Sequence, residues 1–253
     1  MRVDQLLVER GLATSRAQAQ RLIAAGVQWR VGAAAWKAVA KNGDVLPPLA
    51  ELQLQDSAEA RYVSRGGLKL EAALAACSVE VAGKLCLDVG QSTGGFTDCL
   101  LQHGAAQVVG LDVGHGQLHP NLRADPRVVC VEGVNARHVQ AGDVPALSDL
   151  VDGFDVLVAD VSFISLTLVL PALMPLLRPA AHCLLLAKPQ FELQPGQVGK
   201  GGIVKDAALY AVVEQRLRAA CAALGLHVLH WLVSPIEGGD GNREFFIHAQ
   251  TQA

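Results

Sequence analysis

The chain has 253 residues, and its composition excludes several broad classes of protein. Hydrophobic residues make up 51% and charged residues 18%, so the chain can form a packed core and is not disordered as a whole. A net charge of −3 excludes a polybasic protein that binds nucleic acid by excess charge alone, and 4% aromatic residues disfavour a stacking surface for single strands. Any contact with nucleic acid must come from a local patch.

The six cysteines are scattered and include no C-x-x-C pair, so we expect neither a disulfide framework nor a zinc site built on paired thiolates. The eight histidines form no obvious ligand cluster along the sequence, and we predict no metal. The N-terminus lacks an apolar signal core, and prolines interrupt the longest apolar run, between Asp160 and Arg178. That run falls short of the roughly 18 residues of a membrane span. We therefore expect a cytoplasmic protein without a membrane segment.

The first 45 residues are basic, with a net charge of +4, whereas the remainder carries −7. Hydrophobic spacing predicts a short first helix and a second helix over residues 16–25, with Thr14 and Ser15 as sources of an N-cap oxygen. Strands are expected over residues 27–31 and 43–46. Basic side chains at a helix start can bind phosphates. A solvated helical hairpin without a ligand is the alternative interpretation of the same pattern.

Pro47 and Pro48, followed by the polar residues 53–60, are typical of the exit from a small module. We expect this module to end near residue 60, a linker over residues 61–65, and a second domain over residues 66–253.

From residue 84 onward, β-rich runs alternate with helical patterns. This alternation predicts an α/β domain with a mostly parallel sheet covered on both faces, in which ligands bind beyond the carboxyl ends of the strands. The expected strands cover residues 84–89, 108–113, 128–131, 155–160, 183–188, 227–233 and 244–249. The expected helices cover residues 96–103, 168–177 and 206–224.

The turn after the first of these strands reads D-V-G-Q-S-T-G-G-F, in which Gly90 permits a tight turn and the later glycines permit close approach of a ligand. Its spacing differs from the dinucleotide motif G-x-G-x-x-G. Asp112 ends the next strand, where a carboxylate can bind ribose hydroxyls, and Asn135 follows the third. An acidic turn suits a neutral or cationic nucleoside better than a phosphorylated one. We therefore predict S-adenosylmethionine as cofactor, although a tight turn alone would explain the glycines.

Two ionisable residues end neighbouring strands, Asp160 in V-A-D-V-S-F and Lys188 in L-L-A-K-P-Q-F. Because both follow apolar runs, both should emerge at the ligand-binding edge of the sheet, where opposite charges tune one another. Lys69 precedes the sheet and Glu244 opens the last strand. For each residue alone, a structural salt bridge is the commoner role, and their joint placement favours catalysis.

These segments resemble one known family along nearly the whole chain. The first 27 residues are similar to the S4 RNA-binding domain, and the remainder is similar to the TlyA family, which joins an S4 domain to an FtsJ-like (RrmJ-like) methyltransferase domain and carries the label hemolysin. The motifs that carry the resemblance occur in order: S-R-G-G-L-K-L, D-V-G-Q-S-T-G-G-F-T-D, D-V-G-H-G-Q-L, A-D-V-S-F-I-S-L, K-P-Q-F-E, V-G-K-G-G-I-V-K-D and S-P-I-E-G-G-D-G-N-R-E-F-F.

The resemblance implies a Rossmann-like domain with a seven-stranded, mostly parallel sheet behind a small α+β S4 domain. It implies 2′-O-methylation of cytidine in ribosomal RNA, with ribosomal RNA or ribosomal subunits as partners and a catalytic Lys-Asp-Lys-Glu tetrad in which Lys188 accepts the ribose proton. The tetrad maps onto Lys69, Asp160, Lys188 and Glu244. The expected cofactor-binding residues are Asp88, Gly90, Ser92, Gly94, Gly95, Phe96, Asp112 and Asn135. The expected RNA-binding residues are Arg16, Gln20, Arg21, Arg30, Lys37, Arg61 and Arg65.

One residue departs from the family pattern. Gln91 stands in the cofactor turn at a position that is usually small, so its side chain is expected either to crowd the methionine moiety or to point outward. Two alternative functions remain: a non-catalytic RNA-binding or assembly factor that retains the cofactor pocket, and a membrane-lytic protein. The second is suggested only by the hemolysin label and has no basic amphipathic helix to support it.

Overall fold

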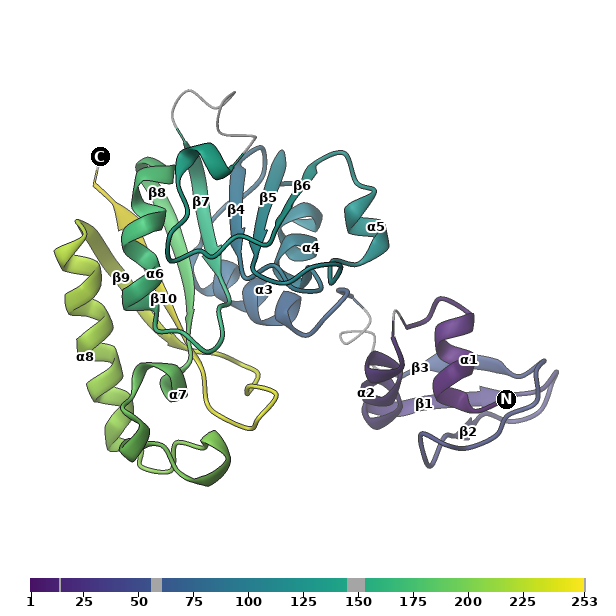
Figure 1. Cartoon of the computed structure of the whole chain (residues 1–253). Coiled ribbons are helices and arrows are strands. Elements are labelled where there is room, and N and C mark those ends of the chain that lie inside the picture. Colours follow the sequence, from purple (N-terminus) through teal and green to yellow (C-terminus); the bar gives the residue numbers. More distant parts are fainter. Residues whose placement is uncertain (14, 56–60, 145–152, 253) are drawn as a thin grey trace. The chain divides into compact units, whose positions relative to one another are not determined.

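The structure is a computed structural model that describes residues 1–13, 15–55, 61–144 and 153–252. Contacts divide the chain into two compact units, Met1–Leu68 and Lys69–Ala253, and each is described here by itself (Figure 1). The predicted N-cap residue Thr14 and the predicted boundary near residue 60 lie outside the described residues. The domain limits predicted from sequence stay predictions.

The smaller unit packs two helices on a three-stranded antiparallel sheet. The helices are α1 (Val3–Glu9) and α2 (Arg16–Gly26), and the sheet has the order β2 (Lys37–Ala38), β1 (Val27–Arg30), β3 (Glu51–Leu54). Ser15 caps α2, since its hydroxyl oxygen accepts a hydrogen bond of 3.2 Å from the Gln18 amide. The two predicted helices and the first strand are confirmed.

The predicted strand over residues 43–46 is wrong, because Val45 makes only an isolated bridge with Arg2. The strand that pairs with β1 is instead β3, in the segment predicted to leave the module. Leu52 and Leu54 pack against the apolar core of this unit while the residues between them face outward. This two-residue alternation is a strand signal that the surrounding polar residues obscured.

The larger unit contains a seven-stranded sheet of order β6-β5-β4-β7-β8-β10-β9. Strands β4 to β8 are parallel to one another, and β10 runs antiparallel to both β8 and β9. All seven predicted strands are therefore confirmed. Their bounds are β4 Leu85–Val89, β5 Gln107–Asp112, β6 Val128–Glu132, β7 Phe154–Ala159, β8 Leu177–Ala187, β9 Leu226–Val233 and β10 Phe245–Thr251.

Helices cover both faces of this sheet, with α6 and α8 on one face and α3 and α4 on the other (Figure 1). The three predicted helices correspond to α4, α6 and α8, whereas sequence patterning missed α3. The bounds are α3 Gly66–Cys77, α4 Gly95–Gln102, α5 Pro120–Arg123, α6 Leu166–Leu173, α7 Pro189–Glu192 and α8 Ala208–Ala223. Among the described residues, none of these helices has the length and apolar character needed to cross a membrane.

The core between the sheet and helices α6 and α8 is almost entirely aliphatic, which explains why the strands read as continuous apolar runs. Leu87, Leu157 and Leu185, from three neighbouring strands, are fully buried in it together with Leu170 of α6 and Leu217 of α8. On the opposite face, Phe96 of α4 stacks on Phe246 of β10.

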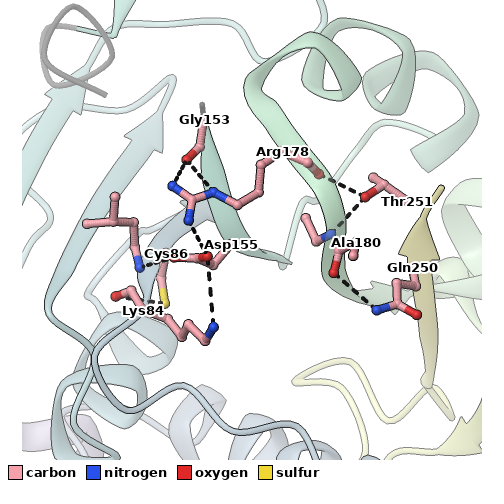
Figure 2. Close-up of polar contacts among 10 residues, drawn as sticks. Lys84, Cys86, Gly153, Asp155, Arg178, Ala180, Gln250 and Thr251 are labelled. Atoms are coloured by element: carbon pink, nitrogen blue, oxygen red, sulfur yellow. Dashed lines mark hydrogen bonds and ion pairs between the residues drawn. The ribbon is translucent and has the colours of Figure 1, made fainter. Parts of the chain in front are cut away.

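A polar network fixes the edge of the sheet at which β4, β7 and β8 begin and the antiparallel β10 ends, opposite the edge where ligands are expected (Figure 2). Arg178 donates to the carbonyl oxygen of Gly153 and, at 2.6 Å, to Asp155 Oδ1, while Asp155 Oδ2 accepts a hydrogen bond from the Leu85 amide. Thr251 bridges the carbonyl oxygen of Arg178 and the amide of Ala181. These bonds join β4, β7, β8 and β10 into one rigid sheet, which holds the opposite edge in place.

Candidate active site

A cavity of about 390 Å³ lies at the carboxyl ends of β4, β5 and β7, the edge at which parallel sheets bind ligands. Four of the residues predicted to bind the cofactor line it: Gly90, Ser92, Asp112 and Asn135. Its remaining wall is largely apolar, with Val89, Leu111, Val134, Ile164 and Val169. Such a wall with a few carboxylates and amides at its rim suits a neutral or cationic nucleoside.

The turn after β4 is shaped to leave backbone and carboxylate groups facing this cavity. Gly90 has a φ of +83°, and a Cβ there would lie 2.5 Å from the carbonyl oxygen of Asp160, so no other residue fits without movement. Asp112 is held from both sides, since Oδ2 accepts from the Ser92 amide and Oδ1 from the Gly114 amide, each at 2.7 Å. A carboxylate has about four acceptor positions, so Asp112 retains capacity for ribose hydroxyls.

Asp88 lies beneath the turn and is fully buried. Its Oδ2 accepts a hydrogen bond of 2.6 Å from the Thr97 hydroxyl, which itself accepts one of 2.9 Å from Gln91 Nε2. Asp88 Oδ1 has no hydrogen-bond partner among the described residues. Desolvation raises the pKa of Asp88 to about 7, with the charge of Asp160 adding to the increase. Asp88 therefore supports the turn from below and does not line the cavity.

The two expectations for Gln91 are both wrong. Its side chain is 4% exposed and packs inward against Gly110 of β5, where an added Cβ would lie only 2.0 Å from the Gln91 amide carbon. The lack of a side chain at Gly110 makes this space, and the hydrogen bond to Thr97 holds the amide there. Gln91 thus neither crowds the cavity nor reaches solvent.

Replacing Asp88 with asparagine is expected to change how stability depends on pH. Between pH 3.8 and about 7 the unfolded chain ionises Asp88 while the folded cofactor-free protein keeps it protonated, so stability contributed by this group falls as pH rises. The variant cannot ionise at this position, so its free energy of unfolding should rise relative to that of the wild type across that range. The increase should be at most about 4 kcal/mol. Urea unfolding from pH 4 to pH 8 measures the difference, and parallel pH profiles of the two proteins would contradict the raised pKa of Asp88.

The four ionisable residues of the predicted tetrad form two ion pairs at this same edge. Lys188 Nζ lies 2.5 Å from Asp160 Oδ1 and donates to Ser162 Oγ at 2.8 Å. Lys69 Nζ, at the start of α3, lies 2.5 Å from Glu244 Oε2, and both of these side chains are buried. The α-helix that sequence patterning missed thus carries one member of the group.

The two pairs are electrostatically connected. Desolvation raises the pKa of Glu244, while Lys69 and, more weakly, Lys188 oppose the increase and Asp160 adds to it. A second cavity, of about 430 Å³, is lined by Lys188, Glu244 and residues of two glycine-containing segments, around Gly201 and Gly239. Asp160 lines the first cavity, so the Lys188–Asp160 pair spans the boundary between the two.

Ser162 and Phe163 line both cavities and were not singled out from the sequence. Phe163 is 91% exposed, has a φ of +64°, and contacts Phe191 with ring centroids 5.1 Å apart. An exposed phenylalanine in the left-handed region is unusual, and strained residues of this kind concentrate at functional sites. No sequence pattern signals a positive φ at phenylalanine, so only the structure reveals it.

Besides Asp88, three residues predicted to contact the cofactor do not line the cavity. Gly94, with a φ of +95°, is the N-cap residue of α4, and Gly95 and Phe96 are buried in the first turn of that helix. A Cβ at Gly94 would lie 2.4 Å from the Leu122 side chain, so this glycine serves packing between α4 and α5. Any contact of these three with a cofactor stays a prediction.

The residues predicted to bind RNA all fall in the smaller unit, Met1–Leu68. Arg16 begins α2 and pairs with the fully buried Asp4 at 2.9 Å, although its own side chain is 55% exposed. Arg30 pairs with Glu51 and lies over Trp36, and Lys37 lies over Trp29. Gln20 and Arg61 are exposed, while Arg21 and Arg65 are half-buried. Two of the cations thus lie over tryptophan rings, in contacts that join β1 to the stretch after it.

Comparison with known proteins identifies the fold and the family. The model of the FtsJ-like methyltransferase family matches residues 62–251, and that of the S4 domain matches residues 1–26. The chain belongs to the FtsJ-like methyltransferase family. This membership confirms the predicted Rossmann-like methyltransferase domain behind an S4 domain, and with it the prediction of S-adenosylmethionine as cofactor. The cavity at the ends of β4, β5 and β7 lies where a parallel sheet binds such a cofactor. Its volume and its polar groups suit that cofactor.

Relatives of this FtsJ-like protein cover almost its whole length. It is 45% identical over 251 residues to the 16S/23S rRNA (cytidine-2′-O)-methyltransferase TlyA of Mycobacterium tuberculosis strain H37Rv, covering 99% of this chain and 90% of that one. It is 38% identical to Hemolysin A of Brachyspira hyodysenteriae, covering 98% and 99%. A solved structure from Streptococcus thermophilus, described as a candidate hemolysin, matches with a TM-score of 0.76 and 39% identity, covering 100% of this chain and 88% of that one.

Proposed function

We propose that this chain transfers a methyl group to the ribose 2′-hydroxyl of a cytidine in ribosomal RNA. The single observation that carries the proposal is the Lys188–Asp160 ion pair, which spans the cofactor cavity and the second cavity. A nucleotide in the second cavity would meet Lys188 on one side and the cofactor on the other. The TlyA relative from M. tuberculosis, whose name states this reaction, supports the same substrate.

Bound S-adenosylmethionine supplies a methyl group on a positively charged sulfur, and the protein must prepare the oxygen that accepts it. A ribose hydroxyl is a weak nucleophile because it keeps its proton. Lys188, when neutral, accepts that proton on Nζ, and the contacts with Asp160 and Ser162 fix where Nζ lies. Holding the reacting groups in place contributes further to the rate.

Lys69 and Glu244 act as positioning residues in this proposal. Their buried pair holds the start of α3 against the residue that precedes β10, and the Glu244 carboxylate lines the cavity beside Lys188. The exposed ring of Phe163, between the two cavities, offers a surface on which a base taken out of its stack can lie.

Transfer of tritiated methyl groups from S-adenosylmethionine to isolated ribosomal subunits tests the proposal. The modified RNA is digested to nucleosides, and the label is expected in 2′-O-methylcytidine. Label on a base or on another nucleoside would contradict the assigned substrate. A protein that binds cofactor and RNA but transfers no label to either subunit would instead be the assembly factor considered as the alternative. The expected cytoplasmic location follows from this substrate and stays a prediction.

The S4 unit is proposed to bind the RNA, with Arg16, Gln20, Arg21, Arg30 and Lys37 as contacts and Arg61 and Arg65 beyond them. In support, the exposed guanidinium of Arg16 lies at the N-terminus of α2, where charge and backbone amides both favour a phosphate. Asp4 orients that guanidinium through a 2.9 Å contact.

Replacing Arg16 with alanine is expected to weaken RNA binding about tenfold, the worth of one charged hydrogen bond of roughly 1.5 kcal/mol. The slope of log affinity against log salt should fall by about 0.7 to 0.9, because one phosphate contact is lost. Fluorescence anisotropy at several salt concentrations measures both. Arg127→Ala, at a surface pair with Asp125, serves as the control and should change neither value. An Arg16 variant with unchanged affinity and slope would exclude the contact.

A further inference from the structure

Three histidines lie side by side on the antiparallel strands, away from the active-site edge. They are His182 on β8, His248 on β10 and His230 on β9, with His230 directly opposite His248 in the register. Nδ1 of His182 lies 3.0 Å from Nε2 of His248, and Nδ1 of His230 lies 3.1 Å from Nδ1 of His248. The three rings are stacked, with centroids 5.2 and 5.3 Å apart. The fold thus builds a cluster that the sequence spacing did not suggest.

Helix α3 adds a thiol to this cluster. Cys77, the last residue of α3, is buried, and one ligand atom from each of Cys77, His230 and His248 lies within 4.8 Å of the other two. Around a tetrahedral zinc ion with bonds of about 2.0–2.3 Å, neighbouring ligand atoms are roughly 3.3–3.8 Å apart. Small side-chain rotations therefore bring these three groups onto one ion.

We propose that Cys77, His230 and His248 bind a zinc ion, with His182 as the outer partner of His248. One thiolate and two imidazoles form a donor set suited to a metal of borderline softness and unsuited to magnesium or calcium. If His248 binds through Nδ1, which faces His230, its Nε2–H donates to Nδ1 of His182. Zinc ligands usually have such an outer acceptor, which fixes the tautomer and the ring. On binding, the Cys77 thiol releases its proton to water.

The metal would join α3 to β10, and the Lys69–Glu244 pair likewise connects α3 to the residue that precedes β10. Cys77 and Lys69 lie eight residues apart on α3, about 12 Å, and His248 lies four residues, about 13 Å, along the chain from Glu244. A bond from α3 to β10 at one end would fix how these elements lie at the other. His230 is exposed, so the ion could be reached from solvent and would hold a water as fourth ligand.

The test is a titration of metal-stripped full-length protein with Co²⁺, which reports its ligands by colour. We expect one equivalent to bind with the visible bands of a tetrahedral site and a thiolate-to-cobalt charge-transfer band, and added Zn²⁺ should abolish both. Cys77→Ser should lose the charge-transfer band, and His230→Gln should weaken binding at least tenfold. His182→Ala should weaken it by about 10–100-fold, as outer partners do.

Two variants outside the cluster serve as matched controls: Cys130→Ser on β6 and His138→Gln on the surface, both of which should bind Co²⁺ as the wild type does. Because His230 is exposed, its replacement should leave the fold intact, which circular dichroism verifies. The absence of a charge-transfer band in the wild type, or its persistence in Cys77→Ser, would overturn the proposal. So would equal Co²⁺ affinity in the wild type and His230→Gln.

Discussion

Replacing Lys188 with alanine is expected to slow methyl transfer by about 10²–10⁴-fold, the usual contribution of a positioned general base. Lys188 lines the second cavity, whereas the cofactor cavity is lined by its partner Asp160. Cofactor affinity should therefore change little. Single-turnover transfer to ribosomal subunits measures the rate, and calorimetric titration with S-adenosylmethionine measures the affinity.

The pH dependence separates a proton acceptor from a residue that only positions the RNA. Lys188 must be neutral to take the ribose proton, so the wild-type single-turnover rate should rise with pH. The residual rate of Lys188→Ala should lack that rise. Loss of positioning alone would lower the rate equally at every pH and would contradict the assigned role.

Lys84→Ala is the matched control, because Lys84 is an exposed lysine at the opposite ends of the strands, 4.0 Å from Asp155 (Figure 2). It should transfer methyl groups at the wild-type rate. If Lys188→Ala retained activity within tenfold of the wild type, another group would have to accept the proton.

Replacing Lys69 with alanine is expected to destabilise the protein by about 3–5 kcal/mol, because it leaves the Glu244 carboxylate buried without its partner. The side chains of Lys69 and Glu244 are 9% and 3% exposed, so water cannot replace the lost contact. Burial already raises the pKa of Glu244, and losing Lys69 removes the largest opposing effect. Urea unfolding measures the loss.

The sign of the pH effect follows from that raised pKa. At low pH both folded and unfolded chains protonate Glu244, so the deficit of the Lys69 variant should be small. As pH rises the unfolded chain ionises Glu244 readily and the folded variant does not, so the deficit should grow towards pH 8. A deficit independent of pH would show that Lys69 stabilises the fold by packing alone.

The double variant Lys69→Met, Glu244→Leu separates stability from function. Removing both charges should restore most of the lost stability, because apolar residues of similar volume often replace a buried ion pair without cost. Methyl transfer should stay impaired if the pair positions Lys188. Recovery of both stability and activity would mean that the pair has no role beyond the fold.

Local patterns were sufficient for much of this fold. All seven strands of the larger sheet were predictable, the central ones because strands buried on both faces are continuous apolar runs, as in the stretch that became β7. Each of these apolar runs ends at a polar residue, and parallel strands end at the same edge of a sheet. This also placed Asp112, Asp160 and Lys188 at one edge. Helix α3 was missed because its small apolar residues give almost no amphipathic pattern, and β3 was missed because polar residues follow it directly.

The sequence by itself determined the type and order of the elements and the edge at which the cofactor cavity lies, since these follow from local periodicity and from the direction of parallel strands. Only the tertiary structure decided which side chains meet. Gln91 turned inward because Gly110, nineteen residues on, leaves room for it. The histidine cluster formed because β9 and β10 pair with His230 opposite His248. Such contacts depend on strand order and register, which arise from packing among distant segments and leave no trace in the local sequence.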